Sequence, residues 1–203
     1  MHRSTAVLTA VLAATALALY YHPVSVLVGR RALVAEVHVV AGLLLPLPTL
    51  LGLLSPAFRA DLGRLNRWVP ADRTWLRRRD RRRAGLPVGK FNAGQKLAAA
   101  LGAGAGLVLV LTGLVLLAPA RVDVPVGWRQ GATFVHDVVS GALILLLAGH
   151  VWQAYRHPLA RRAMRTGAVP ADYARREHPA WVAELDDRPQ PAVGDADVGT
   201  SSV

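Results

Sequence analysis

The sequence from Leu97 to Ala118 reads LAAALGAGAGLVLVLTGLVLLA and contains no charged side chain. A helix that crosses the hydrocarbon core of a membrane needs about 20 consecutive apolar residues, and this stretch supplies them. A helix on the surface of a soluble protein would carry a polar stripe, which is missing here. We therefore predict that residues 97–118 span a membrane as a helix, which satisfies its backbone hydrogen bonds internally.

Three further stretches have the same apolar character: residues 4–21, residues 32–54, which Pro46 and Pro48 interrupt, and residues 132–155. Together the four stretches predict an all-α membrane protein, built as a four-transmembrane-helix bundle within residues 1–157. One alternative concerns the first stretch. Arg3, the apolar run and an Ala-x-Ala pattern at residues 16–18 are also typical of a cleaved secretory signal.

Positive charge is distributed unevenly along the chain, which has 24 Lys and Arg against 13 Asp and Glu. Arginine is concentrated in the loop at residues 55–90 and in the segment at residues 158–185, whereas the other two links carry little. Because cytoplasmic loops are enriched in Lys and Arg, this loop and both termini are predicted to be cytoplasmic. Residues 186–203 are rich in Pro, Asp, Gly and Ser and are predicted to be a disordered tail.

The composition excludes several classes of site. The chain has no cysteine, which excludes disulfides, Cys-ligated zinc, Cys-ligated iron–sulfur clusters and covalently attached c-type haem. The arginine run at residues 77–83 could indicate a nucleic-acid partner. However, no aromatic residues or recognition motif accompany it. We interpret it as an orientation signal that contacts anionic membrane lipid, with no nucleic-acid partner.

Histidines inside the predicted spans are the candidate ligands, because ionisable side chains in lipid are costly and usually functional. His136 and His150 are 14 residues apart, which places them on nearly the same helix face about 21 Å apart in height. With the predicted orientation, His38 meets His136 near the outer side, and His2 meets His150 near the inner side. Two histidine pairs at two depths fit two haems b, each with two imidazole ligands.

Other interpretations of these histidines stay open. His38 and His136 could hydrogen-bond to each other across the bundle, His150 could be interfacial, and His2 could belong to a frayed terminus. Small residues four positions after two of them, Gly42 and Ser140, would leave room for a porphyrin. The remaining histidines, His22, His157 and His178, are expected at the interface or on the cytoplasmic surface.

The segment that opens the third span offers hydrogen-bond donors. The side-chain amides of Asn92 and Gln95, with the backbone N–H groups of a helix start, could bind the two carbonyl oxygens of a quinone. Asn92 is also a favourable helix cap, and it could serve as the cap alone or in both roles.

The segment Gly-Lys-Phe-Asn-Ala-Gly-Gln-Lys at residues 89–96 resembles the corresponding segment of the cytochrome b (gamma) subunit of membrane-bound formate dehydrogenase. The fourth span, with two histidines 14 positions apart, and Glu-His-Pro-Ala-Trp at residues 177–181 are also similar to that family. The histidine pattern is shared with other bacterial cytochrome b type membrane anchors, such as those of hydrogenases and thiosulfate reductases.

The resemblance implies a di-haem b subunit of the inner membrane, not catalytic towards formate by itself. It implies His38 and His136 as ligands of the outer haem, and His2 and His150 as ligands of the inner haem. It places a quinone pocket at Asn92 and Gly94, near His150. An iron–sulfur subunit would deliver electrons from a molybdenum- or tungsten-containing subunit. The alternatives are a haem b anchor of another dehydrogenase, hydrogenase or reductase, and a haem-free membrane anchor.

Overall fold

The computed structural model describes residues 2–79, 85–118 and 122–187, and every regular element in these ranges is a helix. Four helical stretches are long and apolar enough to cross a membrane. They are α1 (His2–Tyr20), α3 (Arg31–Leu44) with its continuation α4 (Leu47–Gly52), α7 (Ala93–Leu117) and α8 (Val126–Arg156). The predicted fold class is confirmed, although α7 and α8 each begin a few residues before the predicted spans.

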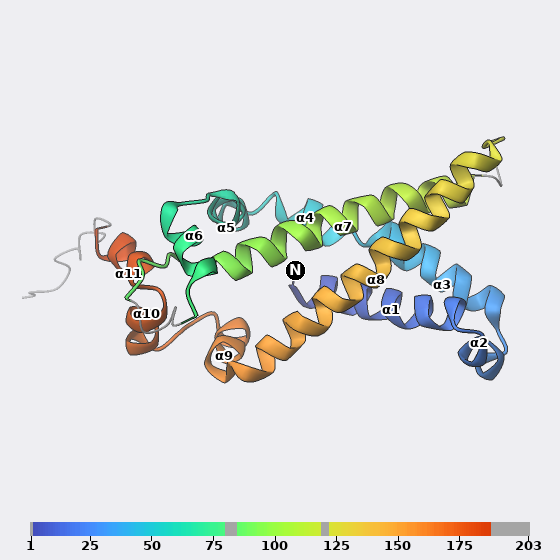
Figure 1. Ribbon diagram of the computed structural model, residues 1–203. Helices are drawn as coiled ribbons and strands as arrows, with labels where there is room; N and C mark the ends of the chain where they lie inside the picture. Colours follow the sequence, from blue (N-terminus) through green and yellow to red (C-terminus); the bar gives the residue numbers. More distant parts are fainter. Residues whose placement is uncertain (1, 80–84, 119–121, 188–203) are drawn as a thin grey trace, which may run out of the picture.

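The four spans form two antiparallel hairpins (Figure 1). In the first, the short helix α2 (His22–Val28) connects α1 to α3, and Gly29 adopts a positive φ of 65° where α2 ends. In the second, α7 packs along α8. Contacts between α3 and α7 bring the hairpins together, but these contacts are far fewer than those within each hairpin. The two hairpins therefore touch each other much less than the two helices within each hairpin do.

The second span is broken at Pro46, as its sequence predicts. Proline has no backbone N–H and cannot continue a helical hydrogen-bond ladder. The chain tightens before it, with the Leu45 N–H donating to the Gly42 carbonyl at 3.3 Å. The ladder resumes when the Leu50 N–H donates to the Pro46 carbonyl at 3.0 Å, which starts α4.

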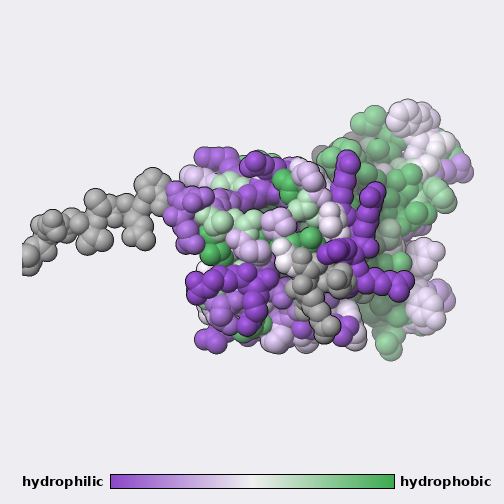
Figure 2. Space-filling model, turned by 60° about the vertical axis from the view of Figure 1, so that its left-hand side comes forward, coloured by the Kyte–Doolittle hydropathy of each residue, from purple (hydrophilic) through white to green (hydrophobic). Residues whose placement is uncertain are grey.

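Five short helices gather at one end of the bundle (Figure 1). They are α5 (Pro56–Asn66), α6 (Pro70–Arg77), α9 (Pro158–Thr166), α10 (Ala171–Glu177) and α11 (Pro179–Asp186), which we call the polar cap. Figure 2 shows that this end of the molecule is mostly hydrophilic, whereas the spans behind it are apolar. Parts of the arginine run at residues 77–83 and of the predicted tail at residues 186–203 lie outside the described residues.

A buried ion pair attaches the polar cap to α7. The Lys96 ammonium lies 2.7 Å from a carboxylate oxygen of Asp72 on α6 and also donates to the Arg67 carbonyl at 2.8 Å. The two paired side chains are only 8% and 7% exposed. The same Asp72 oxygen accepts the Val69 N–H at 2.9 Å, so one carboxylate both starts α6 and holds it against α7.

The C-terminal helices clamp the segment that leads into α7. The Ala180 N–H donates to the Val88 carbonyl at 3.1 Å, and His178 Nδ1 lies 2.8 Å from the Gly89 carbonyl oxygen. The sequence predicted His178 as a surface residue. Instead its ring is half-buried between Tyr173 and Trp181, because the backbone carbonyl at Gly89 needs a donor there.

Replacing Lys96 with methionine should destabilise the protein strongly. The variant leaves Asp72 buried without its cation, and removing one partner of a buried ion pair costs about 3–5 kcal/mol. The matched control is Lys90→Met, which breaks the Lys90–Asp61 pair, whose side chains are 32% and 30% exposed. That loss should cost about 0–1 kcal/mol. Thermal unfolding in detergent measures both, and equal losses would contradict a special role for Asp72–Lys96.

Candidate functional site

The structure brings together the two histidine pairs that the sequence predicts. The ring centres of His38 on α3 and His136 on α8 are 6.3 Å apart, with an interplanar angle of 66°. The ring centres of His2 on α1 and His150 on α8 are also 6.3 Å apart, at 60°. Each pair takes one ring from each hairpin, so both pairs bridge the space between the hairpins. Their role as iron ligands stays a prediction.

The spacing of the rings fits a shared metal ion. Metal–imidazole bonds are about 2.0–2.1 Å long, so one ion bonded to a nitrogen of each ring holds the ring centres about 6 Å apart. A direct hydrogen bond would instead bring two ring nitrogens to about 2.9 Å. Within the described ranges no hydrogen bond joins the rings of either pair, which argues against simple cross-bundle hydrogen bonding. The four histidines therefore fit two haem groups with two imidazole ligands each.

In the His38–His136 pair, a threonine hydroxyl contacts the Nδ1 atom of each ring. His38 Nδ1 lies 2.8 Å from Thr15 Oγ1 on α1, and His136 Nδ1 lies 2.8 Å from Thr112 Oγ1 on α7. The sequence did not single out these threonines. The signal that could have found them is a threonine 23 or 24 residues before the histidine in each hairpin.

Small side chains surround this level of the bundle. Ala18, Ala41 and Ala132 are buried, and each lies one helical turn from Thr15, His38 or His136. Throughout the described part of the chain, no large side chain is fully buried. The most buried residues at this level are therefore small, which is compatible with a bulky flat group between the helices.

Two small residues near the histidines make contacts within their own hairpin or helix, and the space that they were predicted to leave for a porphyrin stays a prediction. A Cβ added to Gly42 would lie 3.8 Å from Leu12 on α1, which is an ordinary contact distance. Ser140 donates its hydroxyl to the Asp137 carbonyl of its own helix at 2.9 Å. By contrast, a Cβ on Gly113 would lie 3.5 Å from His136 Cε1, so Gly113 is the glycine that lies beside this ring.

The start of α7 is a reciprocal capping box. Asn92 Oδ1 accepts the Gln95 N–H at 3.0 Å, and Gln95 Oε1 accepts the Asn92 N–H at 2.9 Å. The capping role considered for Asn92 is therefore confirmed. Both side-chain oxygens are occupied, and their NH₂ groups have no acceptor among the described residues. Within the described ranges these amide donors have no partner, and they could serve a ligand.

The other two quinone candidates, Gly94 and His150, have no hydrogen bond to Asn92 among the described residues. A Cβ on Gly94 would lie 3.0 Å from the Trp75 ring of α6, so glycine is needed there to let the polar cap approach α7. No hydrogen bond links Asn92 to His150 within the described ranges. Their predicted common site therefore stays a prediction that rests on their positions at the capped end of α7 and α8.

Comparison with known proteins agrees with this geometry. A family model described as prokaryotic cytochrome b561 matches residues 1–167, which include all four spans and both histidine pairs. No curated protein matches the chain. With four apolar spans, the match identifies a multi-pass protein of the inner membrane. The chain belongs to the prokaryotic cytochrome b561 family, and it is a haem b membrane protein of electron transfer.

Proposed function

We propose that the chain is a di-haem b subunit that carries electrons across the membrane to a quinone. The observation that supports this proposal most directly is the equal 6.3 Å spacing of two histidine pairs, each shared between the hairpins. His136 and His150 lie 14 residues apart on α8, which separates the two pairs by about 21 Å along the helix. One pair therefore lies towards each side of the membrane.

The polar cap would face the cytoplasm in this proposal. Its arginines exceed those of the opposite end, as expected for the cytoplasmic side of a multi-pass protein. The His2–His150 pair is then the inner pair and the His38–His136 pair the outer one. Haem b, when bound, supplies the one-electron chemistry. The protein residues hold its iron, set its orientation and separate the two sites.

A quinone would bind at the capped end, beside the start of α7. The NH₂ groups of Asn92 and Gln95 supply donors for its carbonyl oxygens, while their oxygens keep the helix capped. The clamp formed by His178 and Ala180 on the preceding segment keeps these donors in a defined place. Reduction at this end would draw protons from the cytoplasm.

The proposed complex is a respiratory formate dehydrogenase, with an iron–sulfur subunit and a molybdenum- or tungsten-containing subunit as partners. Two of the segments that carry the resemblance, residues 89–96 and residues 177–181, contact each other through His178 and Gly89. They therefore form one structural unit rather than two separate similarities. An anchor of a hydrogenase or another reductase is the competing assignment. The two assignments are separated by testing whether formate or hydrogen reduces the haem in the isolated complex. Reduction by formate supports the formate dehydrogenase, and reduction by hydrogen supports the hydrogenase anchor.

The purified protein should hold two non-covalent haems with low-spin spectra. His136→Ala and His38→Ala should each remove one haem and leave the other, because both rings belong to one pair. His22→Ala, outside both pairs, is the matched control and should keep two. A reduced-minus-oxidised spectrum with a haem count per chain measures this. A wild-type protein without haem would overturn the proposal in favour of a haem-free anchor.

Asn92→Asp should slow quinone reduction without loss of haem. Aspartate keeps the oxygen that caps α7 but removes the NH₂ donor, so the helix start survives. Loss of one hydrogen bond to an uncharged head group costs about 0.5–1.5 kcal/mol, which corresponds to a roughly 2–10-fold slower reaction. Haem reoxidation after a quinone pulse, at matched haem content, measures it. Unchanged kinetics would leave Asn92 as a cap only.

A further inference from the structure

The two hairpins carry the same threonine–histidine unit. In the first, Thr15 on α1 contacts His38 on α3, and in the second, Thr112 on α7 contacts His136 on α8, both at 2.8 Å between Oγ1 and Nδ1. In each unit the threonine lies on the first helix and the histidine on the second. The two units meet where the His38 and His136 rings face each other at 6.3 Å.

The threonine hydroxyls are placed to select which nitrogen of each ring carries the proton. Thr15 Oγ1 donates to the Val11 carbonyl at 2.8 Å, and Thr112 Oγ1 donates to the Val108 carbonyl at 2.8 Å. A hydroxyl has one proton and two lone pairs, so each oxygen is then an acceptor towards the imidazole. When the hydroxyl proton is given to the helix carbonyl in this way, Nδ1 carries the ring proton, which leaves Nε2 unprotonated and able to bind a metal.

The other histidine pair lacks this support. Within the described ranges, neither ring of His2 nor of His150 makes a hydrogen bond, although their centres have the same 6.3 Å spacing. The pairs therefore match in spacing but differ in how their rings are held. Threonine suits the supporting role because its branched side chain has few rotamers in a helix and bonds readily to the carbonyl four residues earlier.

We propose that Thr15 and Thr112 are positioning residues that fix the tautomer and orientation of His38 and His136 for iron binding. This inference rests on the proposed function. It makes the His38–His136 site the preorganised one of the two. Partners of this kind typically change metal affinity or activity by about 10–100-fold when removed.

The test compares Thr→Val variants, which keep the side-chain shape and remove the hydroxyl. Thr112→Val is matched by Thr133→Val, whose hydroxyl bonds to the Arg129 carbonyl at 2.9 Å and to no other described residue. Thr15→Val is matched by Thr9→Val, whose hydroxyl makes its one hydrogen bond among the described residues to the Thr5 carbonyl at 2.7 Å. The readouts are transfer of haem to an apoprotein acceptor, the low-spin electron paramagnetic resonance signals and the two midpoint potentials.

We expect Thr112→Val and Thr15→Val to weaken retention of one haem by about 10–100-fold and to shift its signal and potential. The second haem should be unchanged, both controls should resemble the wild type, and Thr112→Ser should restore the wild-type signal. Equal effects on both haems, or none beyond the controls, would overturn the inference while the two-haem function stands. A wild type without two haems would overturn the function itself.

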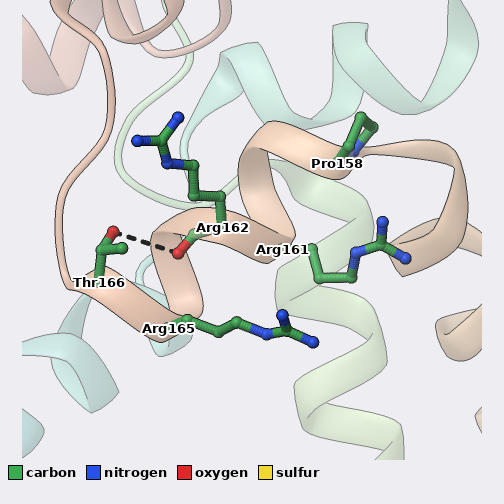
Figure 3. Close-up of a pocket in the computed structure, with 5 residues that line it drawn as sticks. All are labelled: Pro158, Arg161, Arg162, Arg165 and Thr166. Carbon is green, nitrogen blue, oxygen red and sulfur yellow. Dashed lines mark hydrogen bonds between the residues drawn. The ribbon is translucent and has the colours of Figure 1, made fainter.

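A second inference comes from α9 and is independent of haem. Arg161, Arg162 and Arg165, with Pro158 and Thr166, line a cavity of about 250 Å³ (Figure 3). Figure 3 shows Arg161 and Arg165 extending to the same side of the helix, where like charges four residues apart repel. In the described part of the chain, no acidic side chain forms an ion pair with these three arginines.

The position of α9 indicates which anion would neutralise them. The helix begins at Pro158, two residues after α8 ends at Arg156, and the Arg161 guanidinium lies 5.3 Å from the ring centre of Tyr155 near the end of α8. Guanidinium groups match phosphate oxygens in geometry and charge. We infer that Arg161 and Arg165 bind the phosphate of an anionic phospholipid head group at the membrane surface.

Lipid binding by the full chain tests this inference. Phosphatidylglycerol binding, measured by native mass spectrometry against phosphatidylcholine, should fall about fivefold for each arginine removed in Arg161→Gln and Arg165→Gln. The matched control is Arg175→Gln on exposed α10, which should change nothing. Equal losses in the control, or no preference for the anionic lipid, would overturn it. Competition by inorganic phosphate alone would show a soluble anion to be the ligand, which also overturns it.

Discussion

Polar side chains inside a membrane must find partners on neighbouring helices, because lipid offers no hydrogen bonds. In this protein that requirement is met for one histidine pair by side-chain contacts in the part of each hairpin nearer its connecting turn. Thr15 binds His38, Thr112 binds His136, and the two imidazoles then face each other between the hairpins. Buried alanines one turn away let the helices come close enough for these contacts. The contacts that pack the helices together are thus also the contacts that position the candidate site.

The polar cap depends on a different interaction, the buried pair between Asp72 and Lys96. One carboxylate begins α6, neutralises an ammonium on α7 and thereby fixes the first turn of that helix. The contact of His178 with Gly89 holds the preceding segment from the other side. The donors of Asn92 and Gln95 therefore lie on a helix start that is secured by two parts of the chain far apart in sequence.

The two histidine pairs have equal spacing but different surroundings. One is held by hydroxyl groups on both rings, and the other by none that the described residues supply. Hydrogen bonds to ligand histidines and local polarity are among the means by which a protein tunes a bound haem. If each pair holds a haem, as proposed, these different surroundings would give the two haems different potentials.

The sequence by itself determined the four spans, the break at Pro46 and the two histidine pairings. Length and apolar character decide what crosses lipid, and helical periodicity with an assigned orientation decides which histidines share a depth. Tertiary structure alone decided the helices of the polar cap, which depend on contacts such as Arg64 with Glu184, 120 residues apart. It also decided that Gly94 lets the Trp75 ring approach α7, and that threonines contact the histidines of one pair. These roles depend on contacts between residues that are far apart in the sequence, and no local sequence pattern predicts such contacts.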